Sequence, residues 1–98
     1  MKIYIAGPMS GLVEFNRPAF MFTAAKLTGR GNTVLNPAIL PDGLSQAEYM
    51  DICLAMLRCA EVIYLLKGWE ASPGARAEKA LAEKLDMQII YQEEERAP

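Results

Sequence analysis

The sequence predicts an α/β protein with a three-layer flavodoxin- or Rossmann-like fold, in which a four-stranded, mainly parallel sheet has helices on both faces. Short β-rich apolar runs alternate with segments of helical periodicity along the chain. Strands that alternate with helices form βαβ units, and their right-handed crossovers place helices on both faces of a parallel sheet. The 98 residues suffice for one core. We therefore expect a single domain over residues 1–92 and a charged, solvated tail over residues 93–98.

The first half of the chain predicts two strands around one helix. Lys2–Ala6 is a short apolar run that a glycine-bounded loop ends, as expected of a buried strand. Apolar residues recur at helical spacing from about residue 16 to residue 30, with Asn16 as the expected cap. A second strand follows over residues 33–36, and Pro37 ends it.

The second half predicts two further helices and two further strands. Ser45 and Glu48 have the spacing of a capping box, and an apolar face follows them along one helix. A third strand is expected over residues 62–66, a helix from residue 73 to about residue 86, and a fourth strand over residues 87–91. In such sheets ligands bind beyond the carboxyl ends of the strands, so the loops after the first and third strands should meet in one crevice.

Composition excludes several classes of function. The net charge of −2 provides no electrostatic footprint for a nucleic acid polymer. No apolar run is long enough to span a membrane and no signal peptide is apparent, so we expect a cytoplasmic protein. The chain has no histidine, which removes histidine-dependent nucleophiles and the usual zinc sites. We expect no metal and no cofactor, and any chemistry must use carboxylates, tyrosine, hydroxyls or backbone.

Residues 72–78 carry the strongest local signal. Ser72 suits a helix N-cap and Pro73 suits the first helical position, so the free amide of Gly74 would lie at a helix end that favours anions. Glu78 follows about one turn later and is a candidate nucleophile or base. Taken alone, Glu78 is slightly better explained by a salt bridge near Arg76 or Lys79, or by exposure at the helix edge.

Other candidate residues each have a structural explanation as well. Tyr4 in the first strand suits core packing with its hydroxyl satisfied at the end of the sheet. Trp69 and Glu70 could form a lid or stack on a base, or Trp69 could anchor its loop. Asn36 could bind a ligand or simply end its strand. Asp51 falls on the solvated face of its helix.

Two sets of residues complete these observations. Cys53 and Cys59 lie six apart on one expected helix, cannot bridge each other, and suit small buried hydrophobes. The loop after the first strand matches neither the P-loop nor the dinucleotide fingerprint and could be a tight connection. Its members are Gly7, Pro8, Met9, Ser10 and Gly11.

Several motifs, in order, resemble the nucleoside 2-deoxyribosyltransferase-like superfamily over nearly the whole chain. They are KIYIAGPMSG at 2–11, NRPAF at 16–20, NPA at 36–38, GWE at 68–70 and SPGARAE at 72–78. The chain looks like a small, uncharacterised DUF4406-like branch found in bacteriophages and bacteria. The resemblance implies a flavodoxin-like sheet and cleavage of the N-glycosidic bond of deoxynucleosides or their 5′-monophosphates.

The resemblance also implies roles for single residues. Glu78 stands at the position of the nucleophilic glutamate, and Tyr4 at that of the tyrosine that orients it. Ser72 stands where the monophosphate-using enzymes carry serine, which favours a phosphate. Residues expected to bind substrate are Gly7, Pro8, Met9, Ser10, Gly11, Asn36, Cys53, Trp69, Ser72 and Gly74.

One departure divides the functional hypotheses. Family members hold the ribose with an aspartate where this chain has Cys53, and the first loop lacks their phosphate-binding arginine, for which Arg17 or Arg76 could substitute. The first hypothesis is an N-glycosidase or transferase acting on a small nucleoside or nucleotide. The alternatives are a non-catalytic binder that sequesters a nucleotide or nucleotide-derived signal, and a fold-only interaction protein.

We expect a homodimer or higher homo-oligomer, because family sites are often completed by a neighbouring subunit and Leu54 and Leu57 would leave apolar helix surface to bury.

Overall fold

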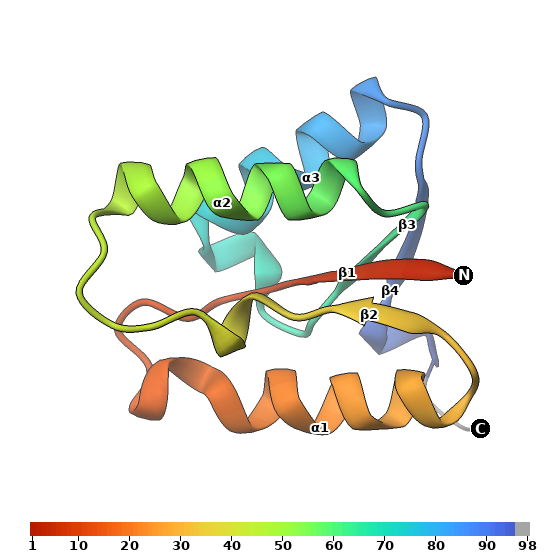
Figure 1. Ribbon diagram of the computed structural model, residues 1–98, viewed down its shortest axis with the longest axis horizontal. Coiled ribbons are helices and arrows are strands. Elements are labelled where there is room, and N and C mark those ends of the chain that lie inside the picture. Colours follow the sequence, from red (N-terminus) through yellow and green to blue (C-terminus); the bar gives the residue numbers. More distant parts are fainter. Residues whose placement is uncertain (96–98) are drawn as a thin grey trace.

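The computed structural model describes residues 1–95 and confirms the predicted three-layer α/β architecture (Figure 1). The strands are β1 (Lys2–Ala6), β2 (Thr33–Leu35), β3 (Val62–Leu65) and β4 (Gln88–Tyr91), in the order β2-β1-β3-β4. All three strand pairings are parallel. Helix α1 (Arg17–Gly29) covers one face of the sheet, and α2 (Gln46–Arg58) and α3 (Pro73–Lys84) cover the other.

Alternation along the central strands divides the core into two halves. Ile3 and Ile5 of β1 pack on the α1 side, whereas Tyr4 packs on the side of α2 and α3. Because successive side chains of a strand point to opposite faces, a strand buried on both faces is apolar throughout. Leu57 of α2 is fully buried in the second half, so the expectation that it leaves exposed surface for an oligomer is wrong.

Local sequence signals explain where the helices begin. Ser45 and Glu48 form the complete capping box at α2, as predicted. The Ser72 hydroxyl accepts a hydrogen bond from the Ala75 amide at α3, which confirms its predicted role as a cap. Asn16 occupies the N-cap position of α1 but makes no side-chain cap bond there. Its side-chain amide instead donates to the Pro8 carbonyl, so Asn16 ties α1 to the first loop.

Short helical turns, which the sequence did not predict, join the main elements. They are η1 (Val13–Asn16), η2 (Pro37–Ile39), η3 (Trp69–Ala71) and η4 (Gln92–Glu95). Within η1, Glu14, Phe15 and Asn16 all have left-handed backbone, with φ of 53°, 53° and 59°. Successive non-glycine residues in this region are strained and must be held by their surroundings.

The expected solvated tail needs a correction at its start. Glu93 and Glu94 are exposed, but the Glu95 carboxylate accepts a 2.6 Å hydrogen bond from the Tyr64 hydroxyl and lies 3.8 Å from Lys26 Nζ and 3.7 Å from an Arg30 guanidinium nitrogen. These contacts fasten η4 to α1 and β3. The rest of that predicted tail, residues 96–98, lies outside the described residues. Within residues 1–95 no helix has both the length and the apolar character needed to cross a membrane.

Candidate functional site

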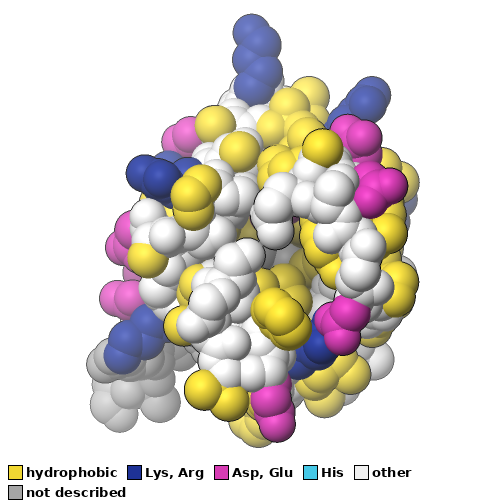
Figure 2. All heavy atoms as spheres, turned by 90° about the vertical axis from the view of Figure 1, so that its left-hand side faces the viewer, with side chains coloured by type: hydrophobic (Ala, Val, Ile, Leu, Met, Phe, Trp, Pro, Cys, Tyr) yellow, Lys and Arg dark blue, Asp and Glu magenta, His cyan; other side chains and the backbone are white. Residues whose placement is uncertain are grey.

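A cleft of about 690 Å³ opens at the edge of the sheet where the strands end. Figure 2 looks onto this edge and shows the hollow near the middle of the face. The volume lies within the usual range for small-molecule sites. The parallel topology brings the loop after β1 and the start of α3 together here, as the sequence predicted. Of the predicted site residues, Tyr4, Gly7, Pro8, Met9, Ser10, Cys53, Ser72, Gly74 and Glu78 line the cleft.

Tyr4 and Glu78 form a hydrogen-bonded pair in the wall of this cleft. The Tyr4 hydroxyl donates to Glu78 Oε2 over 2.8 Å, and the residues are only 1% and 6% exposed. Neither the ion pair nor the edge exposure considered for Glu78 occurs among the described residues. The carboxylate is therefore buried without a cation, which is costly unless the group is neutral or used.

The surroundings of the pair set its protonation. Burial raises the pKa of Glu78 to about 7, while the Tyr4 hydrogen bond acts in the opposite direction. Burial, and then the charge of Glu78, raise the pKa of Tyr4 well above its usual range. Tyr4 therefore remains a donor at neutral pH, whereas Glu78 exchanges its proton there. A carboxyl group poised in this way is a common feature of functional sites.

Cys53 reaches the same part of the cleft from α2. Burial raises the pKa of its thiol, and the Tyr4 hydroxyl partly lowers it. The side chain is neutral at neutral pH and half-buried. The position at which the family resemblance implies a ribose-binding aspartate thus adds no charge to the cleft.

The N-termini of all three α-helices lie at the cleft. Arg17, Gln46 and Pro73, the first residues of α1, α2 and α3, belong to its lining, as does Gly74 in the first turn of α3. The first amides of a helix have no partner within it and favour negative charge. Their convergence makes this edge suitable for an anionic ligand.

Among residues 1–95, Arg17 is the only lysine or arginine that lines the cleft. Its guanidinium lies 2.6 Å from an Asp42 carboxylate oxygen and 5.3 Å from the centre of the Phe15 ring. Asp42 follows η2 and Phe15 lies in η1, so Arg17 connects two segments that border the cleft. Arg76, the other arginine considered for phosphate, does not line it.

Glycines allow the two loops at the cleft to approach each other closely. A Cβ atom at Gly7 would lie 2.8 Å from Leu66 Cβ, which is closer than such atoms approach in proteins. Gly68 has a φ of +90°, and a Cβ atom there would lie 3.3 Å from Pro8. A side chain at Gly7 would therefore push the first loop away from β3 and deform the wall of the cleft.

Three predicted binding residues lie elsewhere. Asn36 accepts a hydrogen bond from the Ala38 amide and donates one to Met21 Sδ, so the structural explanation, termination of its strand, holds. Gly11 is outside the cleft lining. Trp69 packs against Tyr91 with ring centroids 6.0 Å apart, in a separate hollow. Glu70 lines that hollow too, so neither Trp69 nor Glu70 covers the cleft in this structure.

Sequence reasoning missed part of the cleft. Phe15, Asp42, Tyr49 and Met50 also line it. The Tyr49 hydroxyl donates a 2.6 Å hydrogen bond to the Pro41 carbonyl and so ties α2 to the preceding loop. Tyr49 and Met50 are the first-turn residues of a helix whose start was correctly predicted, and that position was the available signal. Within residues 1–95 no group of three or more cysteine and carboxylate side chains is placed to hold a metal ion.

Comparison with known proteins identifies the chain's family. The domain of unknown function DUF4406 matches residues 1–91, which is nearly the whole chain. Comparison with curated proteins found no match. The match includes β1 with Tyr4, α2 with Cys53 and α3 with Glu78, so the whole cleft falls within the shared domain. The chain is therefore a member of the DUF4406 family.

Proposed function

We propose that the protein cleaves the N-glycosidic bond of a deoxynucleoside 5′-monophosphate, with Glu78 as the nucleophile. The observation that carries this proposal is the buried Tyr4–Glu78 hydrogen bond of 2.8 Å in the wall of a cleft of nucleotide size. Tyr4 would fix one carboxylate oxygen and leave Glu78 Oε1 as the attacking atom. The family resemblance in the sequence implies the same pair in the same roles.

The proposed chemistry uses one ionised carboxylate of the cleft as the nucleophile. The ionised Glu78 carboxylate attacks C1′ of the sugar, the bond from C1′ to the base nitrogen breaks, and the base leaves with the electron pair and takes up a proton from solvent water. Water, or a second base in a transferase, then attacks C1′ of the glycosyl ester and releases the carboxylate. A carboxylate suits the oxocarbenium-like transition state of such reactions.

The anionic end of the substrate has matching partners. Ser72 and Gly74 lie at the start of α3, and the first turns of α1 and α2 lie at the same cleft. A 5′-phosphate could accept hydrogen bonds from free helix amides and from Arg17. These features favour the monophosphate over the free nucleoside.

Release of free base tests this proposal. We expect the protein, incubated with each of the four deoxynucleoside 5′-monophosphates, to release base from at least one, as measured by reversed-phase chromatography. The Glu78→Gln variant should lose at least a thousand-fold in rate because it removes the nucleophile. Glu83→Gln, an exposed change on the same helix, is the matched control and should keep full activity. Intact substrate after long incubation at high protein concentration would contradict an enzymatic role.

The second candidate function is a non-catalytic nucleotide binder. It is favoured by Cys53, a neutral thiol at the position where the resemblance implies a sugar-binding carboxylate. A binder should show saturable heat on titration with a nucleotide and no base release. Cys53→Asp separates the two functions, since a gain of hydrolysis would identify a glycosidase scaffold that lacks one group.

Self-association also remains a proposal. Val13, Phe22 and Ile39 are exposed apolar side chains, with 88%, 73% and 69% of their surface accessible. Large exposed apolar side chains are often covered in an assembly. Light scattering should give a mass of at least two chains, and a monomer at working concentration would contradict it.

A further inference from the structure

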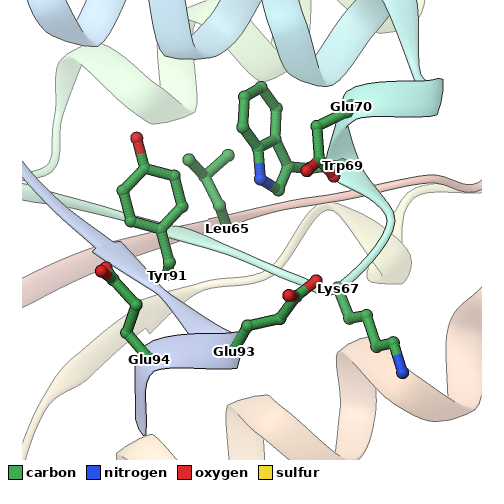
Figure 3. Close-up of a pocket in the computed structure, with 7 residues that line it drawn as sticks. All are labelled: Leu65, Lys67, Trp69, Glu70, Tyr91, Glu93 and Glu94. Carbon is green, nitrogen blue, oxygen red and sulfur yellow. The ribbon is translucent and has the colours of Figure 1, made fainter.

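A second hollow lies at the carboxyl ends of β3 and β4, apart from the cleft. Its volume is about 260 Å³. Figure 3 shows its lining residues, which are Leu65, Lys67, Trp69, Glu70, Tyr91, Glu93 and Glu94. The turn η3 separates the two hollows, because Trp69 and Glu70 face this one and Ala71 lines the cleft. The proposed glycosidase reaction uses none of these residues.

Aromatic and aliphatic side chains form the inner surface of this hollow. The Trp69 and Tyr91 rings are tilted by 42° to each other, with the buried Leu65 between them (Figure 3). The Lys79 ammonium already lies 5.2 Å from the centre of the Trp69 ring. The indole therefore attracts a cation in this fold, as expected from the negative potential over its face.

Carboxylates surround these rings. Glu70, Glu93 and Glu94 come from η3 and η4, and none makes a hydrogen bond or ion pair with another of residues 1–95. Figure 3 shows the Lys67 side chain extending away from the rings, so its ammonium group does not neutralise the carboxylates that surround them. The hollow combines an apolar floor, cation-attracting rings and three carboxylates that have no partner within the described part of the chain.

We propose that this hollow binds an organic cation, namely an alkylammonium or guanidinium group on an aliphatic chain. The aliphatic part would pack on Leu65 and on the Trp69 and Tyr91 rings, and the charged head would lie among Glu70, Glu93 and Glu94. A free polyamine and a lysine or arginine side chain of a partner share this chemistry. The site is independent of the cleft and of the function proposed for it.

Trp69 provides a direct readout because it is the only tryptophan in the chain. Titration with spermidine at low ionic strength should change its fluorescence saturably, and so should titration with a peptide carrying one lysine among neutral residues if the site takes side chains. The double variant Glu93→Gln/Glu94→Gln should raise the apparent Kd at least ten-fold. Both residues are exposed, so the variant should fold, and circular dichroism checks this. Asp51→Asn removes an exposed carboxylate of α2 outside the hollow and is the matched control, with an unchanged Kd.

The titrations with spermidine and with the peptide identify the source of the bound cation, and a saturable response to either one supports the site. A response to spermidine alone assigns a free polyamine, and a response to the peptide alone assigns a partner's side chain. The proposal is overturned if neither cation gives a saturable change, if sodium chloride at matched ionic strength reproduces it, or if the double variant binds as the parent does. Saturation by inorganic phosphate instead would assign the hollow to anions through Lys67 and Lys79, and would also overturn the proposal.

Discussion

The Tyr4 hydroxyl and the Glu78 carboxylate meet over 2.8 Å although 74 positions separate them in the chain. The bond joins the central strand β1 to α3 and lies where the second half of the core borders the cleft. One contact therefore serves two purposes: it satisfies a buried tyrosine hydroxyl and it orients a carboxylate. Its consequences can be measured as activity, as stability and as pH dependence.

Replacing Tyr4 with phenylalanine should change the pH profile more than the maximal rate. The Tyr4 hydrogen bond lowers the pKa of Glu78 against the effect of burial, so its loss raises that pKa above about 7. We expect base release at pH 7 to fall about five-fold and the acidic limb of the profile to move up by about one pH unit. Rates measured from pH 5 to 9 check this. A loss of rate that is the same at every pH would show that Tyr4 acts on folding alone.

Stability should decrease as the pH rises from about 4.5 to about 7. The pKa of Glu78 is about 7 in the folded protein, above its ordinary 4.5, so the folded state keeps a proton that the unfolded state releases in this range. The buried neutral carboxyl therefore makes its full contribution to the free energy of unfolding below pH 4.5. This contribution is at most about 3 kcal/mol, and it is lost as the pH rises through 7. The glutamine side chain of the Glu78→Gln variant stays neutral at every pH, so the stability of this variant should lack this pH-dependent component. Thermal unfolding of both proteins at several pH values measures it, and parallel curves would contradict the prediction.

Asp42 should compete with an anionic ligand for Arg17. The two side chains are 2.6 Å apart at the cleft, and Arg17 has no other carboxylate partner among residues 1–95. Asp42→Asn should tighten binding of a deoxynucleoside 5′-monophosphate by about three-fold, and Arg17→Gln should weaken it by about ten-fold. Isothermal titration checks both variants. Binding of the unphosphorylated nucleoside is the control and should not respond to Asp42→Asn.

The two cysteines should react very differently with a maleimide. Cys59 is exposed at the end of α2, whereas Cys53 is half-buried in the cleft and burial raises the pKa of its thiol. Because the thiolate is the reactive form, Cys53 should react at least ten-fold more slowly. A cleft ligand should slow Cys53 further and leave Cys59 unchanged. Mass spectrometry of digested protein distinguishes the sites, and equal protection of both would contradict this location for the ligand.

The fold could be predicted because it depends on strong, local signals, whereas the pairing of Tyr4 with Glu78 was implied only by the family resemblance. A continuous apolar run ended by a glycine-bounded loop defined β1, the Ser45 capping box defined the start of α2, and the cap Ser72 defined the start of α3. The rule that the carboxyl ends of parallel strands meet at one edge then brought the loops after β1 and β3 into one crevice. The full burial of Glu78 was not predicted, since its sequence surroundings alone slightly favoured a salt bridge or exposure at the helix edge.

Residues placed by backbone conformation could not be predicted in the same way. Trp69 faces the second hollow because Gly68, with φ of +90°, begins the turn η3. The sequence shows that glycine permits this turn but not which side the indole will take. Arg17 and Asp42 lie 25 positions apart. Their contact depends on the left-handed backbone conformation just before α1, which the residue types Glu14 and Phe15 do not predict. Asn36 was equally ambiguous, since a strand end and a ligand site both favour asparagine.

The shared direction of the four strands also gives the molecule two different edges, one that carries the cleft and an opposite one where the strands begin. Met1, Asn32 and Cys59 lie at the edge opposite the cleft, where the Met1 amino group donates to Asn32 Oδ1 over 3.1 Å. A surface tether attached through Cys59 would therefore hold the protein with its cleft directed toward bulk solution. Immobilised in that orientation, the protein could be screened against whole libraries of metabolites without blocking the cleft.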